Sequence, residues 1–427
     1  MPFEKLFEPI QIGSVKIKNR FAYAPTNHVF QNWDGDRMDE EELAYYTARA
    51  MGGIGLMIYG AILSTRFGVP YMQHPWKFCY DIAHVPGLSI LAENIRIAGS
   101  VPFIQLLQVP SSGGRNWTGI QPVAPSAVMG VEPPYRGTPS QQIILKQIGD
   151  SWAAHNVGGT SDCTMAREIT PDEIQTVIKE NTHACRLATL AGFDGIELHL
   201  CHGYLTSEFR DPRMNKRTDK YGGSEENRHR FLLELTDEAI RAAKGENRNM
   251  VVGARVDTTC YGGGYDFEDT KRLALELQEV GLDYYHLTGG PDPVPGGPES
   301  AQRRDGMLLD YAKELKKLLK IPVITPSVHD LKLAEQAITE GWTDMVSNAH
   351  QFIADPQFVN KVKKNRLDDI IECDRCGFCG TRGPSGLDLP ARCGVNPEVG
   401  FERYNPKYQI RKGFTKAGML PHVLRKK

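Results

Sequence analysis

Short apolar runs alternate along the chain with longer stretches in which apolar residues recur at helical spacing. The apolar runs predict eight β-strands, at Phe21–Ala24, Ile54–Tyr59, Pro102–Leu107, Gly195–His199, Met250–Arg255, Tyr284–Leu287, Val323–Thr325 and Met345–Val346. Helical segments are expected between them. Thr170–Glu173 offers a capping residue, a proline at the first helical position and early acidic residues, and Ser224–Asn227 offers a second helix start. Leu308–Leu319 repeats apolar residues at helical spacing.

Eight strand–helix units predict a parallel sheet, and eight is the number that closes a (β/α)8 TIM barrel in the α/β class. An open doubly wound sheet is the alternative. It would usually carry a glycine-rich turn after its first strand, and the sequence has none there. A leading segment, Pro9–Asn19, predicts a hairpin around Gly13-Ser14 that closes the barrel floor.

Composition narrows the class of protein. The chain has 427 residues, 41% hydrophobic and 24% charged, which excludes a disordered, collagen-like or coiled-coil protein. The formal net charge is −2, so neither nucleic acid nor a membrane surface is an expected partner. There is no run of 18 apolar residues and no N-terminal signal-peptide pattern. We therefore expect a cytoplasmic chain with reduced thiols.

Two regions depart from a compact barrel. An insertion of about 60 residues, 110–169, is rich in Gly, Pro and Ser and follows the third strand. It would project from the C-terminal face, where barrel enzymes place their chemistry, either as a surface loop or as a wall of the substrate site. The expected divisions are a barrel over 1–367, a metal-binding segment over 368–404 and a basic tail over 405–427. Solvation is the ordinary role of such a tail, and docking the rarer one.

Four of the nine cysteines fall within 21 residues, at Cys373, Cys376, Cys379 and Cys393. Clustering of this kind in a reducing compartment indicates metal ligation rather than disulfides. Three thiolates at two-residue gaps, with a fourth from a later turn, favour a 4Fe–4S cluster. Structural zinc is the alternative, although zinc prefers two separated C-x2-C pairs. Because an iron–sulfur cluster moves single electrons, we expect a second redox cofactor in the barrel.

Two histidines and a tyrosine follow the fourth strand in the segment His199-Leu200-Cys201-His202-Gly203-Tyr204. At the C-terminal end of a barrel strand, His199 and His202 could polarise one oxygen, and the Tyr204 phenol could donate a proton. A core histidine without a catalytic role is the alternative for either imidazole.

These residues closely resemble those of the Old Yellow Enzyme family of FMN-dependent flavoenzymes. The resemblance rests on the H-x-x-H-G-Y-L motif at 199–205, the N-x-R-x-D-x-Y-G-G motif at 215–223 and the four cysteines. Together they resemble the iron–sulfur branch that includes 2,4-dienoyl-CoA reductase, enoate reductase and trimethylamine dehydrogenase. The similarity extends from Leu6 to Pro397, which is nearly the whole chain.

The resemblance implies FMN on the C-terminal face of the barrel. The positions implied to contact its ring are Pro25, Thr26, Asn27, Ala61, Gln105 and Arg255. Arg255 would stabilise negative charge on the reduced flavin. The phosphate would lie after strands seven and eight, near Ser327, Ala349 and His350. Here the chain departs from the family, because Pro326-Ser327 replaces Gly-Gly and Ala349-His350 replaces Gly-Arg.

The same resemblance implies an ene-reductase. His199 and His202 would hold the carbonyl oxygen of an α,β-unsaturated substrate, FMN would supply a hydride to the β-carbon, and Tyr204 would protonate the α-carbon. An enone, an enoate and an enoyl-CoA all remain candidate substrates. An amine dehydrogenase or N-demethylase is the first alternative, although Ala61 and Gly383 stand where trimethylamine dehydrogenase carries aromatic residues. A non-catalytic electron-transfer subunit is the second.

No G-x-G-x-x-G fingerprint for an FAD- or NAD(P)H-binding domain occurs in the chain. We therefore expect a separate electron-donor or electron-acceptor flavoprotein as partner. The sequence leaves open whether the chain forms a homo-oligomer.

Overall fold

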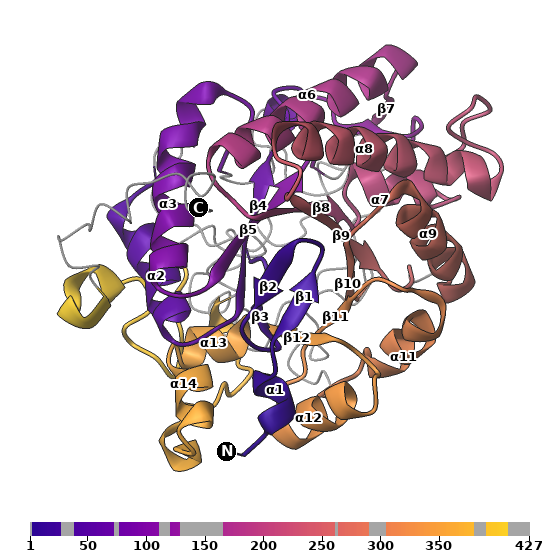
Figure 1. Ribbon diagram of the computed structural model, residues 1–427. Coiled ribbons are helices and arrows are strands. Elements are labelled where there is room, and N and C mark those ends of the chain that lie inside the picture. The colour runs from indigo at the N-terminus through magenta and orange to yellow at the C-terminus, as the bar shows by residue number, and fades with distance from the viewer. Residues whose placement is uncertain are drawn as a thin grey trace, which may run out of the picture.

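In the computed structural model, eight parallel strands close into a barrel, and their helices form a ring around it (Figure 1). The structure describes residues 2–26, 38–71, 77–110, 120–128, 165–260, 264–289, 305–379 and 390–408. In order around the barrel the strands are β3 (Phe21–Tyr23), β4 (Leu56–Leu63), β5 (Val101–Leu107), β8 (Gly195–Leu200), β9 (Val251–Asp257), β10 (Tyr284–Thr288), β11 (Val323–Pro326) and β12 (Met345–Asn348). The predicted (β/α)8 barrel is confirmed, and the open sheet is excluded.

The helices begin where capping residues stand. Thr170 and Glu173 form a reciprocal capping box at the start of the helix after β7, and the Ser224 hydroxyl accepts from the Asn227 N–H at a second predicted start. The described helices are α1 (Glu4–Phe7), α2 (Glu40–Met51), α3 (Val85–Ile97), α6 (Pro171–Leu190), α7 (Leu205–Arg210), α8 (Glu225–Glu246), α9 (Phe267–Val280), α11 (Leu309–Leu318), α12 (Leu331–Thr339), α13 (His350–Ala354) and α14 (Phe358–Lys363).

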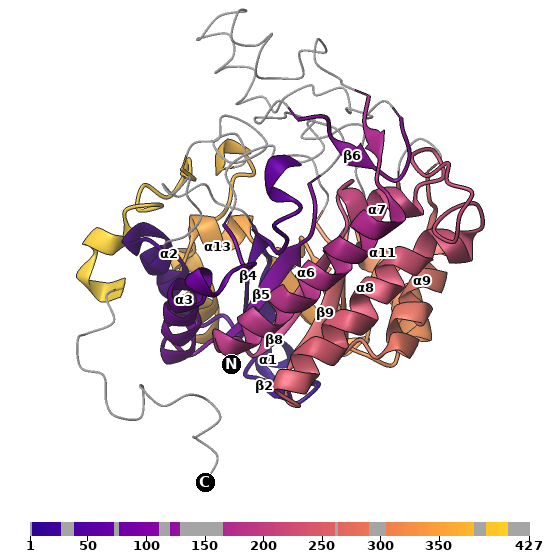
Figure 2. The ribbon, with the colours of Figure 1, turned by 90° about the horizontal axis from the view of Figure 1, so that it is seen from above.

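The predicted hairpin closes one end of the barrel. Strands β1 (Ile10–Ile12) and β2 (Val15–Ile17) pair antiparallel, and the Ser14 hydroxyl donates to the Asn249 carbonyl just before β9. Gly13 lies at a φ of 52°, in the left-handed region that favours glycine. In Figure 2 the hairpin lies at the end of the barrel opposite to β6 (Val123–Ala124). The C-terminal end of the strands is therefore the end available for a site.

The two ends of the insertion after β5 are tied to the barrel. Strand β6 pairs in parallel with β7 (Arg167–Glu168). The Arg217 guanidinium donates to the carbonyls of Pro125 (2.8 Å) and Ile169 (2.6 Å), and Asp219 holds its other edge at 2.6 Å. The N-x-R-x-D-x-Y-G-G motif thus has a structural role here. Most of the insertion, at 111–119 and 129–164, lies outside the described residues, so its role as a wall or a surface loop stays a prediction.

Residues 390–408 pack against α2. Arg49 and Glu402 form a fully buried ion pair of 2.9 Å, and Glu41 faces Arg392 at 3.2 Å and Arg403 at 3.7 Å. This region contains two short 3-10 turns, η5 (Glu402–Tyr404) and η6 (Pro406–Tyr408). The basic tail beyond residue 408 lies outside the part of the chain that the structure describes.

Within the described ranges, no helix has the length and apolar character needed to cross a bilayer.

Candidate functional site

The inner wall of the barrel changes from apolar to polar toward its C-terminal end. Alternate residues of each strand face the interior. Near the hairpin these residues form an apolar cluster, which includes Leu56, Ile58, Phe103, Val251, Ile324 and Met345. One level higher stand Gln105 and Glu197, and at the rim stand His199, Arg255 and Thr288. The polar rim is where the family resemblance places the chemistry.

A chain of hydrogen bonds crosses the rim from β8 to β10. His199 Nε2 and His202 Nδ1 share a hydrogen bond of 3.0 Å, and His202 Nε2 lies 3.0 Å from the Thr288 hydroxyl. The Cys201 thiol lies beside both rings, 3.4 Å from His202 Nδ1 and 3.6 Å from His199 Nε2. The two predicted histidines therefore meet, in a chain that ends on Thr288.

The turn that carries His202 is fixed by a carboxylate. His202 lies at a φ of 62° and Gly203 at 72°, so the chain turns sharply after β8. The Asp257 carboxylate accepts the His202 backbone N–H at 2.8 Å and the Tyr265 hydroxyl at 2.8 Å. Burial raises the pKa of Asp257 to about 7, against the hydrogen bonds from His202 and Tyr265.

Tyr204 lies beside the histidine chain. Its ring packs edge-on against His199, with centroids 4.9 Å apart, and contacts the small apolar cluster that includes Ala61, Leu63 and Leu107. Burial, and to a smaller extent the nearby Cys201, raises the pKa of the Tyr204 phenol well above its ordinary value. The phenol therefore keeps its proton at neutral pH, which a proton donor requires.

His199 is a neutral imidazole at physiological pH. Burial, and to a smaller extent the charge of Arg255, lowers the pKa of His199 to about 3. A neutral imidazole cannot act as a cationic acid, but its N–H can donate to an oxygen that gains charge during a reaction.

Arg255 brings a fixed positive charge to the rim. It donates to the Pro25 carbonyl and to the Thr288 hydroxyl, both at 3.3 Å. Its Nε is buried with no hydrogen-bond partner, as is Oδ1 of Asn348 at the end of β12. A donor on β9 and an acceptor on β12, both without a partner, fit a bound group that carries both acceptors and donors. The ring of FMN is such a group.

The ends of β3, β11 and β12 are followed by four other positions implied to contact FMN, at Thr26, Ser327, Ala349 and His350. The Thr26 hydroxyl donates to the Ala24 carbonyl, whereas Asn27 lies outside the described residues. Ser327 adopts a φ of 62°, and its N–H donates to the Ser347 carbonyl at 3.0 Å. Its hydroxyl, rather than its N–H, is therefore the group available for a phosphate. Ala349 immediately precedes α13, and His350 is the exposed first residue of that helix.

Three of the four predicted cysteine ligands influence one another electrostatically. Burial raises the pKa of the Cys373 and Cys376 thiols, and both also feel Cys393. An added Cβ on Gly394 would lie 3.3 Å from Cys376 Sγ, so this glycine leaves room beside the thiol. Among the eight cysteines in the described ranges, none forms a disulfide. Four thiols in one segment fit a metal or cluster as a donor set.

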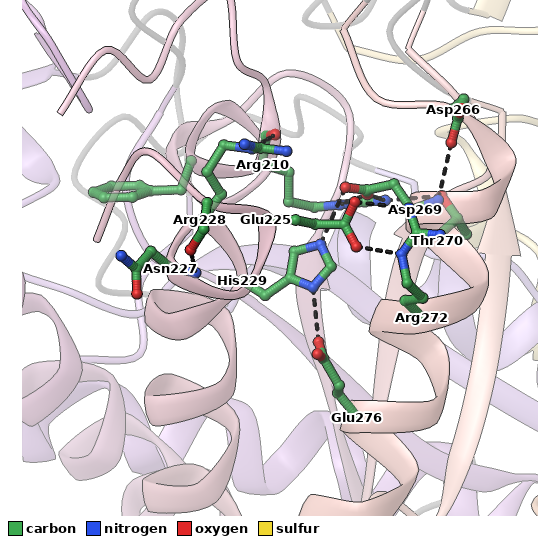
Figure 3. A network of polar contacts seen from close by, with 12 residues as sticks. Arg210, Glu225, Asn227, Arg228, His229, Asp266, Asp269, Thr270, Arg272 and Glu276 are labelled. Carbon is green, nitrogen blue, oxygen red and sulfur yellow. Dashed lines mark hydrogen bonds and ion pairs between the residues drawn. The ribbon is translucent and has the colours of Figure 1, made fainter. Parts of the chain in front are cut away.

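A second group of possible metal ligands lies outside the barrel, between α8 and α9 (Figure 3). The two nitrogens of His229 face Glu276 at 2.7 Å and Asp269 at 3.2 Å. Asp269 also accepts from Arg210 at 2.7 Å, and Glu225 from Arg272 at 2.7 Å. Arginine and histidine donors therefore already occupy these carboxylates, so this group is a salt-bridge network.

Several residues of the site were missed by sequence reasoning. Thr288 and Asp257 end their strands, and polar residues at C-terminal strand ends are a signal that could have identified them. Tyr265 gave no such signal, because its contact with Asp257 depends on the loop between β9 and α9.

Comparison with known proteins identifies the family of the chain. A family model described as the NADH:flavin oxidoreductase / NADH oxidase family matches residues 5–369. An NADH oxidase of Thermoanaerobacter brockii is 34% identical, with 94% of this chain and 57% of the relative covered. A cinnamate reductase of Clostridium sporogenes is 28% identical, with 96% and 60% covered. The chain thus spans less than two thirds of the length of these relatives.

Among solved structures, a 2-naphthoyl-CoA reductase in complex with 2-naphthoyl-CoA superposes with a TM-score of 0.81 at 28% identity, covering 96% of this chain and 59% of the other. A histamine dehydrogenase from Rhizobium sp. 4-9 has a TM-score of 0.77 at 24% identity, covering 94% and 53%, and shows the shared fold alone. The matched residues include β3 to β12 and every group of the rim. The chain belongs to the NADH:flavin oxidoreductase / NADH oxidase family of oxidoreductases.

Proposed function

We propose that the chain is an FMN-dependent ene-reductase that reduces the C=C bond of an α,β-unsaturated carbonyl compound. The observation that carries the proposal is the rim itself. The neutral His199 and its bonded partner His202 stand beside a protonated Tyr204, and Arg255 supplies a positive charge next to them. These are the groups needed to polarise a carbonyl and to deliver one proton.

The rim fits a flavin, and membership in a flavin oxidoreductase family supports FMN as the cofactor. Pro25, Thr26, Asn27, Ala61, Gln105 and Arg255 would hold its ring, and Ser327, Ala349 and His350 its phosphate. When bound, reduced FMN supplies the hydride for the β-carbon. Arg255 would hold the ring by charge, and the Asn348 amide oxygen offers an acceptor at the end of β12.

The chain's own residues would then complete the reaction. His199 and His202 would orient the substrate by exchanging the hydrogen bond that they share for hydrogen bonds to its carbonyl oxygen, and these bonds would strengthen as negative charge builds there. Thr288 would keep His202 in place, since it already lies 3.0 Å from His202 Nε2. Tyr204 would give its proton to the α-carbon.

Similar proteins support this class of substrate. One relative is named a cinnamate reductase, and one structural neighbour is a reductase in complex with 2-naphthoyl-CoA. Both names describe aromatic or unsaturated acyl compounds, which agrees with a rim built to hold a carbonyl oxygen.

We further propose that Cys373, Cys376, Cys379 and Cys393 hold a 4Fe–4S cluster in a segment over 368–404, beside a barrel over 1–367. When bound, such a cluster exchanges single electrons. The electrons would come from, or go to, a separate flavoprotein or another domain.

An amine dehydrogenase is the second candidate, because an N,N-dimethylglycine/sarcosine dehydrogenase of Chromohalobacter salexigens is 28% identical over 91% of this chain. A cationic amine would be attracted by aromatic faces or carboxylates. The described rim instead presents Arg255 and the small side chain of Ala61, which favours the ene-reductase.

Anaerobic purification followed by flavin and iron analysis tests the cofactors. Dithionite-reduced protein is then mixed with enones, enoates, enoyl-CoA esters and methylamines. Reoxidation of the flavin by an unsaturated carbonyl, with the saturated product found by mass spectrometry, is the expected result. Bleaching of the oxidised flavin by an amine, with no reoxidation by any unsaturated carbonyl, would favour the second candidate.

A further inference from the structure

A layer of buried polar side chains crosses the barrel one level below the rim. Glu197 is its centre: one carboxylate oxygen accepts from Gln105 Nε2 at 2.7 Å, and the other lies 2.9 Å from the Tyr284 hydroxyl and 2.8 Å from His286 Nδ1. His286 Nε2 in turn lies 2.8 Å from the Ser347 hydroxyl. Four strands contribute to this layer, and none of its side chains is more than 1% exposed. No role assigned so far to the rim requires it.

The barrel wall is shaped to admit these side chains. Gly253 stands between Glu197 and Tyr284 in the register of the sheet, and a Cβ there would lie 2.1 Å from the Tyr284 ring. Gly60 on the other side would place a Cβ 2.8 Å from Cβ of Gln105. Larger residues at these two positions would expel Tyr284 or Gln105 from the interior. The layer is therefore an integral part of the barrel, and glycines on β4 and β9 leave room for its side chains.

Glu197 carries a negative charge in this layer. Burial raises its pKa, but the hydrogen bond and charge of His286, together with Arg255 and Tyr284, outweigh burial and lower the pKa overall. Burial lowers the pKa of His286, against the charge and hydrogen bond of Glu197, which raise it. A fixed charge in an apolar barrel is costly unless it is fully hydrogen-bonded. A fold that retains it needs another reason than stability.

Glu197 lies directly below the groups that would hold the flavin. It is two residues before His199 on β8, and the residue paired with it, Gly253, is two residues before Arg255 on β9. Two residues along a strand correspond to about 7 Å. The negative charge of Glu197 and the positive charge of Arg255 are thus stacked along the barrel axis, one level apart.

We propose that Glu197 is a positioning residue for the flavin. It fixes the orientation of the Gln105 amide, and its negative charge opposes the positive charge of Arg255. This inference rests on the proposed function, because it requires a flavin at the rim. The NH2 group of Gln105 donates to Glu197, so the oxygen of the same amide would be left to accept from an N–H of the flavin ring.

The charge of Glu197 has a predictable effect on the flavin. Reduction adds negative charge to the ring, and a carboxylate beneath it in a low-dielectric barrel opposes that change. The positive charge of Arg255 would favour reduction of the ring, and the negative charge of Glu197 would partly offset this effect. The layer would therefore hold the reduction potential below the value that Arg255 alone would produce.

The test compares Glu197→Gln with Tyr284→Phe as the matched control. Glu197→Gln removes the charge and keeps a side chain of the same shape, whereas Tyr284→Phe removes one hydrogen bond to the carboxylate and keeps its charge. We expect Glu197→Gln to raise the midpoint potential of the bound flavin, with oxidised FMN bound about tenfold more weakly relative to reduced FMN. That ratio corresponds to about 30 mV for a two-electron couple. Tyr284→Phe keeps the charge and should shift the potential less, because the Tyr284 hydrogen bond lowers the Glu197 pKa less than His286 does.

An unchanged potential in Glu197→Gln, or an equal shift in both variants, would overturn the inference. If Glu197→Gln does not fold, His286→Leu provides a second route, because loss of this hydrogen bond favours protonation of Glu197 and should shift the potential in the same direction. Absence of that shift in His286→Leu would also overturn it. Wild-type protein that binds no FMN in fluorescence-quenching titrations would instead contradict the proposed function itself.

Discussion

Two histidine clusters of this molecule contain similar residues in opposite electrostatic settings. In each cluster, the atoms that could bind a metal lie within 4.8 Å of one another. The cluster at the barrel rim consists of His199, Cys201 and His202. The cluster between α8 and α9 consists of Glu225, His229 and Asp269. Burial and Arg255 lower the pKa of His199 to about 3. Burial also lowers the pKa of His229, but its hydrogen bonds to Asp269 and Glu276 outweigh burial and raise the pKa overall.

The difference shows that neighbours, rather than residue type, decide what a histidine can do. His199 shares its hydrogen bond with another imidazole and faces a cation, so it is a neutral donor that a substrate can engage. His229 has both nitrogens committed to carboxylates, as Figure 3 shows, and it serves to join two helices. The first cluster belongs to the chemistry and the second to the stability of the barrel.

The largest effect is expected in the α8–α9 network. Asp269→Ala would leave the fully buried Arg210 and His229 without their shared carboxylate. The free energy of unfolding should fall by about 3–5 kcal/mol, the cost of breaking a buried ion pair. Chemical denaturation measures it. Asp310→Ala is the control, because its carboxylate is 92% exposed in a surface pair with Lys313 and should change stability by at most about 0.5 kcal/mol. Equal effects of the two variants would contradict the account.

The next effect is expected at the rim. His199→Leu removes a neutral donor from the oxygen-binding pair and should reduce turnover of an unsaturated carbonyl by about 10²–10³-fold, with stability nearly unchanged. Steady-state kinetics with the best substrate of the panel measure it. His183→Leu on the exposed side of α6 is the control and should leave turnover intact. Loss of folding instead of turnover would place His199 with His229 as a structural residue.

The smallest effect is a dependence of stability on pH. Because the folded-state pKa of His229 lies above its ordinary value of 6.5, its contribution is fully present below pH 6.5 and is lost as pH rises through the folded pKa. Stability of the wild type should therefore decline across that window, and His229→Gln should flatten the decline. Thermal unfolding at several pH values checks this. The exposed His183→Leu should leave the slope as it is, and an identical slope in His229→Gln would disprove the assignment.

Much of the fold could be predicted because local signals agreed with the final structure. The eight apolar runs, the hairpin at Gly13-Ser14 and the capped helix starts at Thr170 and Ser224 all depend on neighbouring residues. His199, His202 and Tyr204 stood out because they follow one strand, and strand ends of a barrel meet at one face.

Other features could not be predicted, because they depend on contacts between distant strands. Glu197 looked like one polar residue in an apolar run. Its partners Gln105 and His286, and Ser347 that bonds His286, lie on three other strands. Arg217 belongs to a motif that resembles a functional signature, yet it binds the carbonyls of Pro125 and Ile169, 92 and 48 residues away. Only the closed barrel brings these groups together.

The central claim is that the rim protonates a substrate carbon through Tyr204, and Tyr204→Phe tests it most directly. The variant keeps the ring that packs on His199 but loses the proton. Flavin reduction by dithionite should be unchanged, whereas reoxidation by the unsaturated carbonyl should slow by about 10²–10⁴-fold in stopped-flow measurements. The exposed Tyr404→Phe is the control. Reoxidation of Tyr204→Phe at the wild-type rate by every substrate of the panel would contradict the account.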